Sequence, residues 1–180
     1  MQLFIKEKEM LSKILLTLLM VNCSLLTVHA QVTQEWAARF SGPGNWYDRA
    51  SSIAVDGSGN VYVTGWSVRS ATQRDYATLK YNSSGVQQWE ARYNGSGNGN
   101  DAATSLAVDG SGNVYVTGYS GNFPNHDYAT IKYNSSGDSL WVRRYNGPGN
   151  SDDEAYSLAV DGSGNVYVAG NSATIKYNSS

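Results

Sequence analysis

A twelve-residue segment, A-V-D-G-S-G-N-V-Y-V-[TA]-G, occurs three times in this chain and constrains its fold more than any other feature. The copies begin at Ala54, Ala107 and Ala159, so the spacing is 53 and then 52 residues. A tryptophan and an aspartate also recur in this register: Trp36, Trp89 and Trp141, and Asp48, Asp101 and Asp153. A fixed period of about 50 residues indicates one supersecondary unit that is stacked on copies of itself.

Each repeat contains the pattern of four short strands. In the second repeat the predicted strands cover residues 104–109, 113–120, 127–133 and 139–145. Glycine-containing turns separate the first strand from the second and the third from the fourth, as short hairpins require. The connection between the second and third strands varies in length, and the many Tyr and Trp residues favour strands over helices.

Apolar side chains lie on both faces of the predicted sheet. Val114 and Val116 share one face, while Tyr115 and Thr117 share the other. A sheet with this pattern needs another sheet on each side. Small residues in the first strand and bulky aromatic residues in the fourth fit the narrow inner and wide outer ends of a propeller blade. We therefore expect an all-β chain of four-stranded antiparallel β-propeller blades, with a stacked array of β-sandwiches as the alternative.

A longer consensus surrounds the twelve-residue segment. It reads D-x-A-x-S-[IL]-A-V-D-G-S-G-N-V-Y-V-[TA]-G, and in the first two copies D-Y-A-T-[LI]-K-Y-N-S-S-G and a tryptophan follow. This pattern, over residues 36–180, resembles the repeat of the bacterial SBBP β-propeller family; propellers of the NHL type share its D-x-x-G-N-V-Y-V core and are the near alternative. The resemblance implies a secreted or surface-attached protein and no single activity.

The repeats divide the region 31–180 into units of approximately 36–88, 89–140 and 141–180. The last unit lacks its fourth strand and about eight residues between its second and third strands. Closed propellers typically contain four to eight blades. About three blades therefore predict an incomplete propeller, which we expect to associate with further blades or with other copies of itself.

The first 30 residues have the pattern of a secretory signal peptide. Lys6, Lys8 and Lys13 precede an apolar run over residues 14–21, and V-H-A ends at Ala30. Because the run is short for a bilayer, we expect cleavage rather than a membrane span. The single cysteine lies in this leader, so we expect no disulfide in a secreted or surface-associated mature chain.

The three D-G-S-G-N turns have two interpretations. They place oxygen-bearing side chains at alternate positions, as the first half of a calcium loop does, but they lack its later bidentate glutamate. A plain hairpin turn uses the same residues without a cation. Because every repeat contains the turn, we favour the structural interpretation. Calcium is a weak candidate at Asp56, Asp109 and Asp161, and no other cofactor is expected.

Residues suited to catalysis are scarce after the leader. His126 is the only histidine there, and we expect it to be a surface residue of the variable loop without a nucleophile beside it. The acidic run 152–154 is expected to be solvated, as charge runs usually are. The sequence therefore predicts no catalytic residue.

The variable loops carry the candidate binding residues Trp66, Tyr119 and Phe123, whose rings can stack on sugars or hold a peptide. We expect a non-catalytic scaffold or binding module for an extracellular protein or glycan. A fragment of a propeller lyase or glycosidase and a structural spacer of a larger surface protein are the alternatives. Positive and negative residues are interspersed without a basic stripe, so nucleic acid is not an expected partner.

Overall fold

The computed structural model describes residues 32–44, 46–70 and 73–179, and its regular structure consists of strands. Over these residues there is no helix that could cross a membrane. The predicted signal peptide, residues 1–30, lies outside the described residues, so its cleavage stays a prediction.

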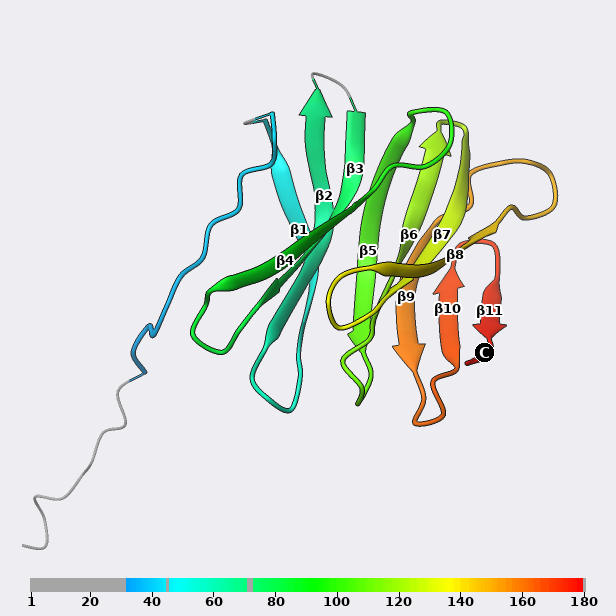
Figure 1. Cartoon of the computed structure of the whole chain (residues 1–180). Coiled ribbons are helices and arrows are strands. Elements are labelled where there is room, and N and C mark those ends of the chain that lie inside the picture. The colour runs from blue at the N-terminus through cyan, green and yellow to red at the C-terminus, as the bar shows by residue number, and fades with distance from the viewer. Residues whose placement is uncertain (1–31, 45, 71–72, 180) are drawn as a thin grey trace, which may run out of the picture. The chain divides into compact units, whose positions relative to one another are not determined.

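The strands form three antiparallel sheets, which we call blades 1, 2 and 3 (Figure 1). Blade 1 contains β1 (Asp48–Val55), β2 (Val61–Ser70), β3 (Gln73–Tyr81) and β4 (Gln87–Tyr93). Blade 2 contains β5 (Asn100–Val108), β6 (Val114–Asn122), β7 (Asn125–Tyr133) and β8 (Ser139–Tyr145). Blade 3 contains β9 (Ala155–Val160), β10 (Val166–Gly170) and β11 (Thr174–Tyr177). In each blade the strands pair in chain order, which confirms the all-β fold of incomplete propeller blades.

Turns and loops gather at opposite ends of the blades (Figure 1). The turn rim consists of the nearly identical hairpin turns at residues 56–60, 82–86, 109–113, 134–138 and 161–165. The loop rim consists of the variable hairpin ends and the links between blades, at residues 46–47, 66–69, 73–75, 94–100, 119–127 and 146–154.

One glycine in each turn of the turn rim has the positive φ that the sequence predicts. Gly112 has a φ of 78° and Gly137 a φ of 89°. Both values lie in the left-handed region, where other residues are strained. The amide of Gly112 donates to the carbonyl of Asp109 at 3.0 Å, which closes the tight turn between β5 and β6.

The hydrophobic core lies between the blades. Val114 and Val116 on β6 pack toward blade 1, whereas Tyr115 on the same strand packs toward blade 3. The three side chains are buried. Alternation along one strand therefore supplies the cores of two junctions, as the sequence pattern predicts.

Candidate functional site

The variable hairpins of the loop rim are fixed near their tips by hydrogen bonds to the link that follows. In blade 1, the Gln73 side chain donates to the Asn98 carbonyl at 2.8 Å. In blade 2, the His126 amide donates to Asp152 Oδ1 at 3.1 Å, and the Asp153 amide donates to the His126 carbonyl at 2.7 Å. Each hairpin is therefore part of a junction between two blades.

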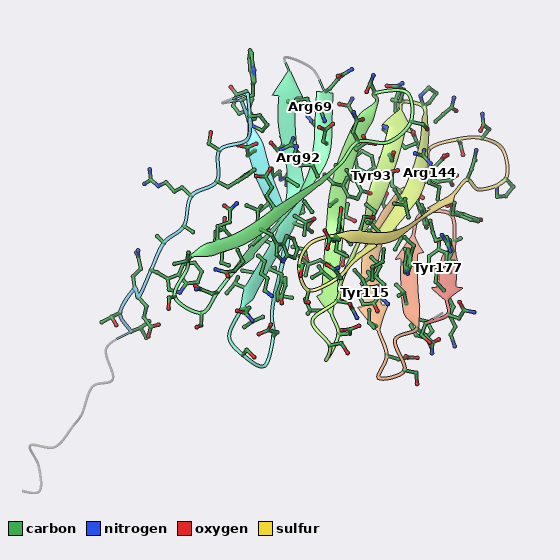
Figure 2. The ribbon with its side chains drawn as sticks, in the orientation of Figure 1. Arg69, Arg92, Tyr93, Tyr115, Arg144 and Tyr177 are labelled. Atoms are coloured by element: carbon green, nitrogen blue, oxygen red, sulfur yellow. The ribbon has the colours of Figure 1, made fainter. Side chains whose placement is uncertain are left out.

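A polar cluster lies under the loop rim in blades 1 and 2. Arg144 on β8 donates to the Ser120 hydroxyl at 2.9 Å, to the Ser120 carbonyl at 3.0 Å and to Asp127 at 2.9 Å. Arg92 on β4 donates in the same way to the hydroxyl and carbonyl of Ser67, at 3.1 and 3.2 Å. Figure 2 shows both arginines toward the loop-rim ends of their blades. Because the cluster recurs at equivalent positions, we assign it to the scaffold.

The recurrent aspartate at or just before the first strand ties down the preceding link. Asp101 accepts a hydrogen bond from the Gly95 amide at 2.8 Å, and burial raises the pKa of this carboxyl. Asp153 in blade 3 accepts from the Gly147 amide in the same way and is 2% exposed. The prediction that the whole run 152–154 is solvated is therefore wrong for Asp153, because its carboxylate is a buried acceptor for this link.

One cluster on the loop rim surrounds His126, whose position in blade 1 is occupied by Arg74. His126 is 8% exposed, so its prediction as a surface residue is wrong. Its ring centroid lies 4.7 Å from that of Tyr119 and 6.4 Å from that of Phe123. Its Nδ1 lies 3.1 Å from Asp152 Oδ1 and 3.6 Å from Glu154 Oε1. The imidazole is thus enclosed between two aromatic rings and two carboxylates.

Of the three candidate binding residues, the structure brings two together around His126: Tyr119 on β6 and Phe123 at the tip of its hairpin. Trp66 lies at the equivalent position of blade 1 and is covered by the Arg74 guanidinium, 4.3 Å from the ring centroid. Arg74 is not among the binding residues that the sequence predicts. Trp66 pairs with Tyr76 across the hairpin, and Arg74 lies two residues before Tyr76 on β3. Because side chains at such diagonal positions are close enough to interact, the pairing of these strands would have indicated Arg74.

Each calcium candidate on the turn rim organises its own turn. Asp109 Oδ1 accepts from the amides of Ser111 and Asn113 at 2.9 Å each. Its Oδ2 accepts from the Asn113 side chain at 2.7 Å and the Tyr115 hydroxyl at 3.0 Å. Asp56 makes the equivalent four bonds, at 2.8–3.0 Å.

These bonds change the acidity of the turn residues. Hydrogen bonds, chiefly from the asparagine side chain, lower the pKa of Asp56 and of Asp161 to about 2. Burial, followed by the bond to Asp109, raises the pKa of Tyr115 to about 12. Among the described residues there is no group of three metal-ligating side chains arranged around a common point. The geometry accounts for the aspartates as turn-forming residues, and calcium binding stays a prediction.

One known family matches the chain three times, once in each repeat. The SBBP family, described as a beta-propeller repeat, matches residues 35–67, 91–124 and 140–174, which together make up more than half of the chain. The chain belongs to the SBBP family. No curated protein matches this SBBP chain.

The SBBP matches do not coincide with single blades. The match over residues 91–124 begins within β4 of blade 1 and ends between β6 and β7 of blade 2. This match therefore includes the end of the outer strand of one blade, the link on the loop rim and the first two strands of the next blade. A match to the repeat therefore spans a blade junction.

Proposed function

We propose that this SBBP chain is a non-catalytic propeller module that binds an extracellular protein or glycan through its loop rim. The supporting observation is the distribution of exposed rings: Phe123 and Tyr47 are each 79% exposed and lie on the loop rim. The turn rim instead repeats the same short sequences in every blade. A binding surface needs residues that differ from the scaffold, and the loop rim supplies them.

The local structure suits such a role. The hairpin that carries Phe123 is anchored to the following link through His126, so the exposed ring is held on an ordered base. Aromatic rings offer a large contact area with few rotatable bonds, which limits the entropy lost on binding. An exposed ring on an anchored hairpin therefore favours stacking on a sugar or on an apolar peptide side chain.

The proposal includes export from the cell. Its support is the leader pattern of residues 1–30, with lysines before an apolar run and a cleavage pattern ending at Ala30. Amino-terminal sequencing of protein recovered from the culture medium or cell surface tests this part. A sequence beginning at Gln31 is expected, and retention of the full chain inside the cell would contradict it.

Binding is tested with a glycan array and an array of purified extracellular proteins, followed by titration of each hit. Phe123→Ala and Tyr47→Ala are each expected to weaken a genuine hit by about tenfold or more, because central aromatic residues dominate binding energy. Val86→Ala is the matched control, since Val86 is 58% exposed on the turn rim. Hits that respond equally to all three variants, or no hit on either array, would contradict binding through the loop rim.

A further inference from the structure

Each blade junction joins two unlike surfaces. The leading face, which contacts the preceding blade, is mainly aliphatic; in blade 2 it contains Leu106, Val114, Val116, Ile131 and Tyr133. The trailing face, which contacts the following blade, is aromatic; in blade 1 it contains Tyr62, Tyr76, Trp89 and Tyr93. The aromatic trailing face of one blade therefore packs against the aliphatic leading face of the next. Because the sequence repeats, equivalent residues form both junctions between the described blades.

One face of each kind is open in a single chain. On the leading faces, Ile53 of blade 1 is 67% exposed, whereas the equivalent Leu106 and Leu158 are 6% and 9% exposed. On the trailing faces, Tyr167 of blade 3 is 37% exposed, whereas Tyr115 of blade 2 is 1% exposed. The surface open on blade 1 is thus the natural partner of the surface open on blade 3.

Hydrogen bonds across the junctions repeat as well. The Leu106 amide of blade 2 donates to the Ser52 hydroxyl of blade 1 at 3.3 Å. The Leu158 amide of blade 3 donates to the Ser105 hydroxyl of blade 2 at 3.2 Å. Blade 3 has a serine at the same position, Ser157, so it offers the same acceptor to a following blade.

Residues 36–40 lie against blade 1 as the outer strand of a preceding blade would. Their sequence, W-A-A-R-F, corresponds to W-E-A-R-Y on β4. The Trp36 indole donates to the Ser83 carbonyl at 3.2 Å, and the Trp89 indole on β4 donates to the equivalent Ser135 carbonyl of blade 2 at 3.0 Å. Residues 36–40 therefore already make the contacts of a fourth strand with the next blade.

A groove of about 300 Å³ separates residues 36–40 from part of the leading face of blade 1. Trp36, Phe40, Ile53 and Leu79 are among the residues that line it. At the junction between blades 1 and 2, aromatic side chains of the trailing face occupy the space next to the equivalent aliphatic residues. The groove lies where such side chains of a preceding blade would pack.

Among the described residues, blade 3 has no strand that corresponds to residues 36–40. Its described strands end with β11 at the sheet edge. In blade 1 Trp89 pairs with Lys80, and in blade 2 Trp141 pairs with Lys132. The equivalent lysine on β11 is Lys176. A strand added beside β11 in this register would place its tryptophan opposite Lys176.

We propose that two copies of this chain close into a six-bladed ring, in which residues 36–40 of each copy form the fourth strand of blade 3 of the other. The described residues of each copy make up three blades, so a ring of such copies contains a multiple of three blades, and six is the only such number between four and eight. The two new junctions are related by a two-fold axis, so each copy gives and receives the same contacts. The assembly is independent of what the loop rim binds.

Light scattering during size-exclusion chromatography of the purified chain tests the assembly. The expected mass is that of two copies and stays constant over about 1–100 µM. Ile53→Lys is expected to raise the concentration needed for dimerisation by about tenfold or more, since it places a charge in the new junction. Leu140→Lys is the matched control, because Leu140 is 52% exposed but lies on blade 2. A monomer at every concentration, or a mass that keeps growing, would overturn the ring.

A cysteine pair tests the register independently. Ala38 and Thr174 are equivalent to Ala91 and Thr78, which are paired in blade 1. In a Cys23→Ser background, Ala38→Cys with Thr174→Cys is expected to give a covalent dimer that a reductant dissociates. Ala38→Cys with Ile175→Cys is the control, because adjacent strand residues face opposite sides. No covalent dimer, or equal yields from the two pairs, would show that this strand does not complete blade 3.

Discussion

Blades 2 and 3 share their repeated sequence but differ in what covers them. Their central strands pair in the same register, with Val116 opposite Ile131 in blade 2 and Val168 opposite Ile175 in blade 3. Burial differs along the third strand: Ile131 is 1% exposed, whereas Ile175 is half-buried. The repeat sequence thus determines the hairpins, while the surrounding strands and blades determine how much apolar surface is buried.

A second difference lies at the same end of the blades as the loop rim, where the β10–β11 hairpin of blade 3 is shorter: residues 171–173 stand where residues 119–129 stand in blade 2. Blade 2 supports this connection through the Tyr128 hydroxyl, which donates to the Ala173 carbonyl at 3.1 Å. The same hydroxyl accepts from the amides of Ser172 and Ala173 at 3.2 and 3.1 Å. At the junction of blades 1 and 2, the equivalent Tyr76 hydroxyl donates to the Ala129 carbonyl at 3.1 Å. The neighbouring blade therefore stabilises the shorter hairpin.

The largest expected effect is on the free energy of unfolding, when the equivalent isoleucine is shortened to alanine in blade 2 and in blade 3. Ile131→Ala should lower the free energy of unfolding by about 3–4 kcal/mol, because it leaves a cavity in a fully covered core. Ile175→Ala should cost about 1–2 kcal/mol, because water already reaches part of that side chain. Urea unfolding followed by tryptophan fluorescence and by circular dichroism measures both.

The two spectroscopic probes also show whether the blades unfold together, since repeat arrays can lose two-state behaviour. Equal losses for the two variants would mean that blade 3 is covered as fully as blade 2 in solution. If the two-copy ring forms, the measurement should be made on the Ile53→Lys background, so that both variants are compared in single chains.

An intermediate loss of stability is expected when the tyrosine hydroxyls that support the neighbouring hairpins are removed. Tyr128→Phe should cost about 2–3 kcal/mol, because it removes a donor and leaves two backbone amides without their acceptor. Tyr76→Phe should cost about 1 kcal/mol, since it removes one hydrogen bond. Thermal unfolding of the two variants gives the comparison, and hydrogen exchange at the Ser172 and Ala173 amides should rise only in Tyr128→Phe. The two tyrosines would be equivalent if neither the midpoints nor the exchange rates differed.

The sequence predicts the hairpins well because their determinants are local. Gly112 has the predicted left-handed φ, and the predicted alternation of Val114 and Tyr115 separates two cores. The burial of His126 could not be predicted in this way. Its partners come from its own hairpin and from Asp152 in the link to blade 3, and nothing in the local pattern indicates that these segments meet. Long-range contacts between irregular segments leave no periodic signal.

The smallest effect is expected at the turn rim in acid. Hydrogen bonds, chiefly from the Asn165 side chain, lower the pKa of Asp161 from 3.8 to about 2. Burial opposes the lowering for Asp109 in blade 2, although hydrogen bonds led by that from Asn113 still lower its pKa. These carboxylates bind protons less readily in the folded chain than in the unfolded one, so in their ionised form they stabilise the fold. This contribution to stability is present above pH 3.8 and is lost as the pH falls toward 2.

Asp161→Asn removes this titration while keeping an oxygen acceptor in the turn. The thermal midpoint of the variant should therefore fall less steeply than that of the unaltered chain between about pH 4 and pH 2. Asp109→Asn should flatten the profile less, since burial in blade 2 already offsets part of the pKa shift. Midpoints recorded across this range at constant ionic strength make the comparison. A steeper profile in Asp161→Asn would mean that the turn carboxylate binds protons more readily in the folded chain than in the unfolded one, opposite to what its four hydrogen bonds imply.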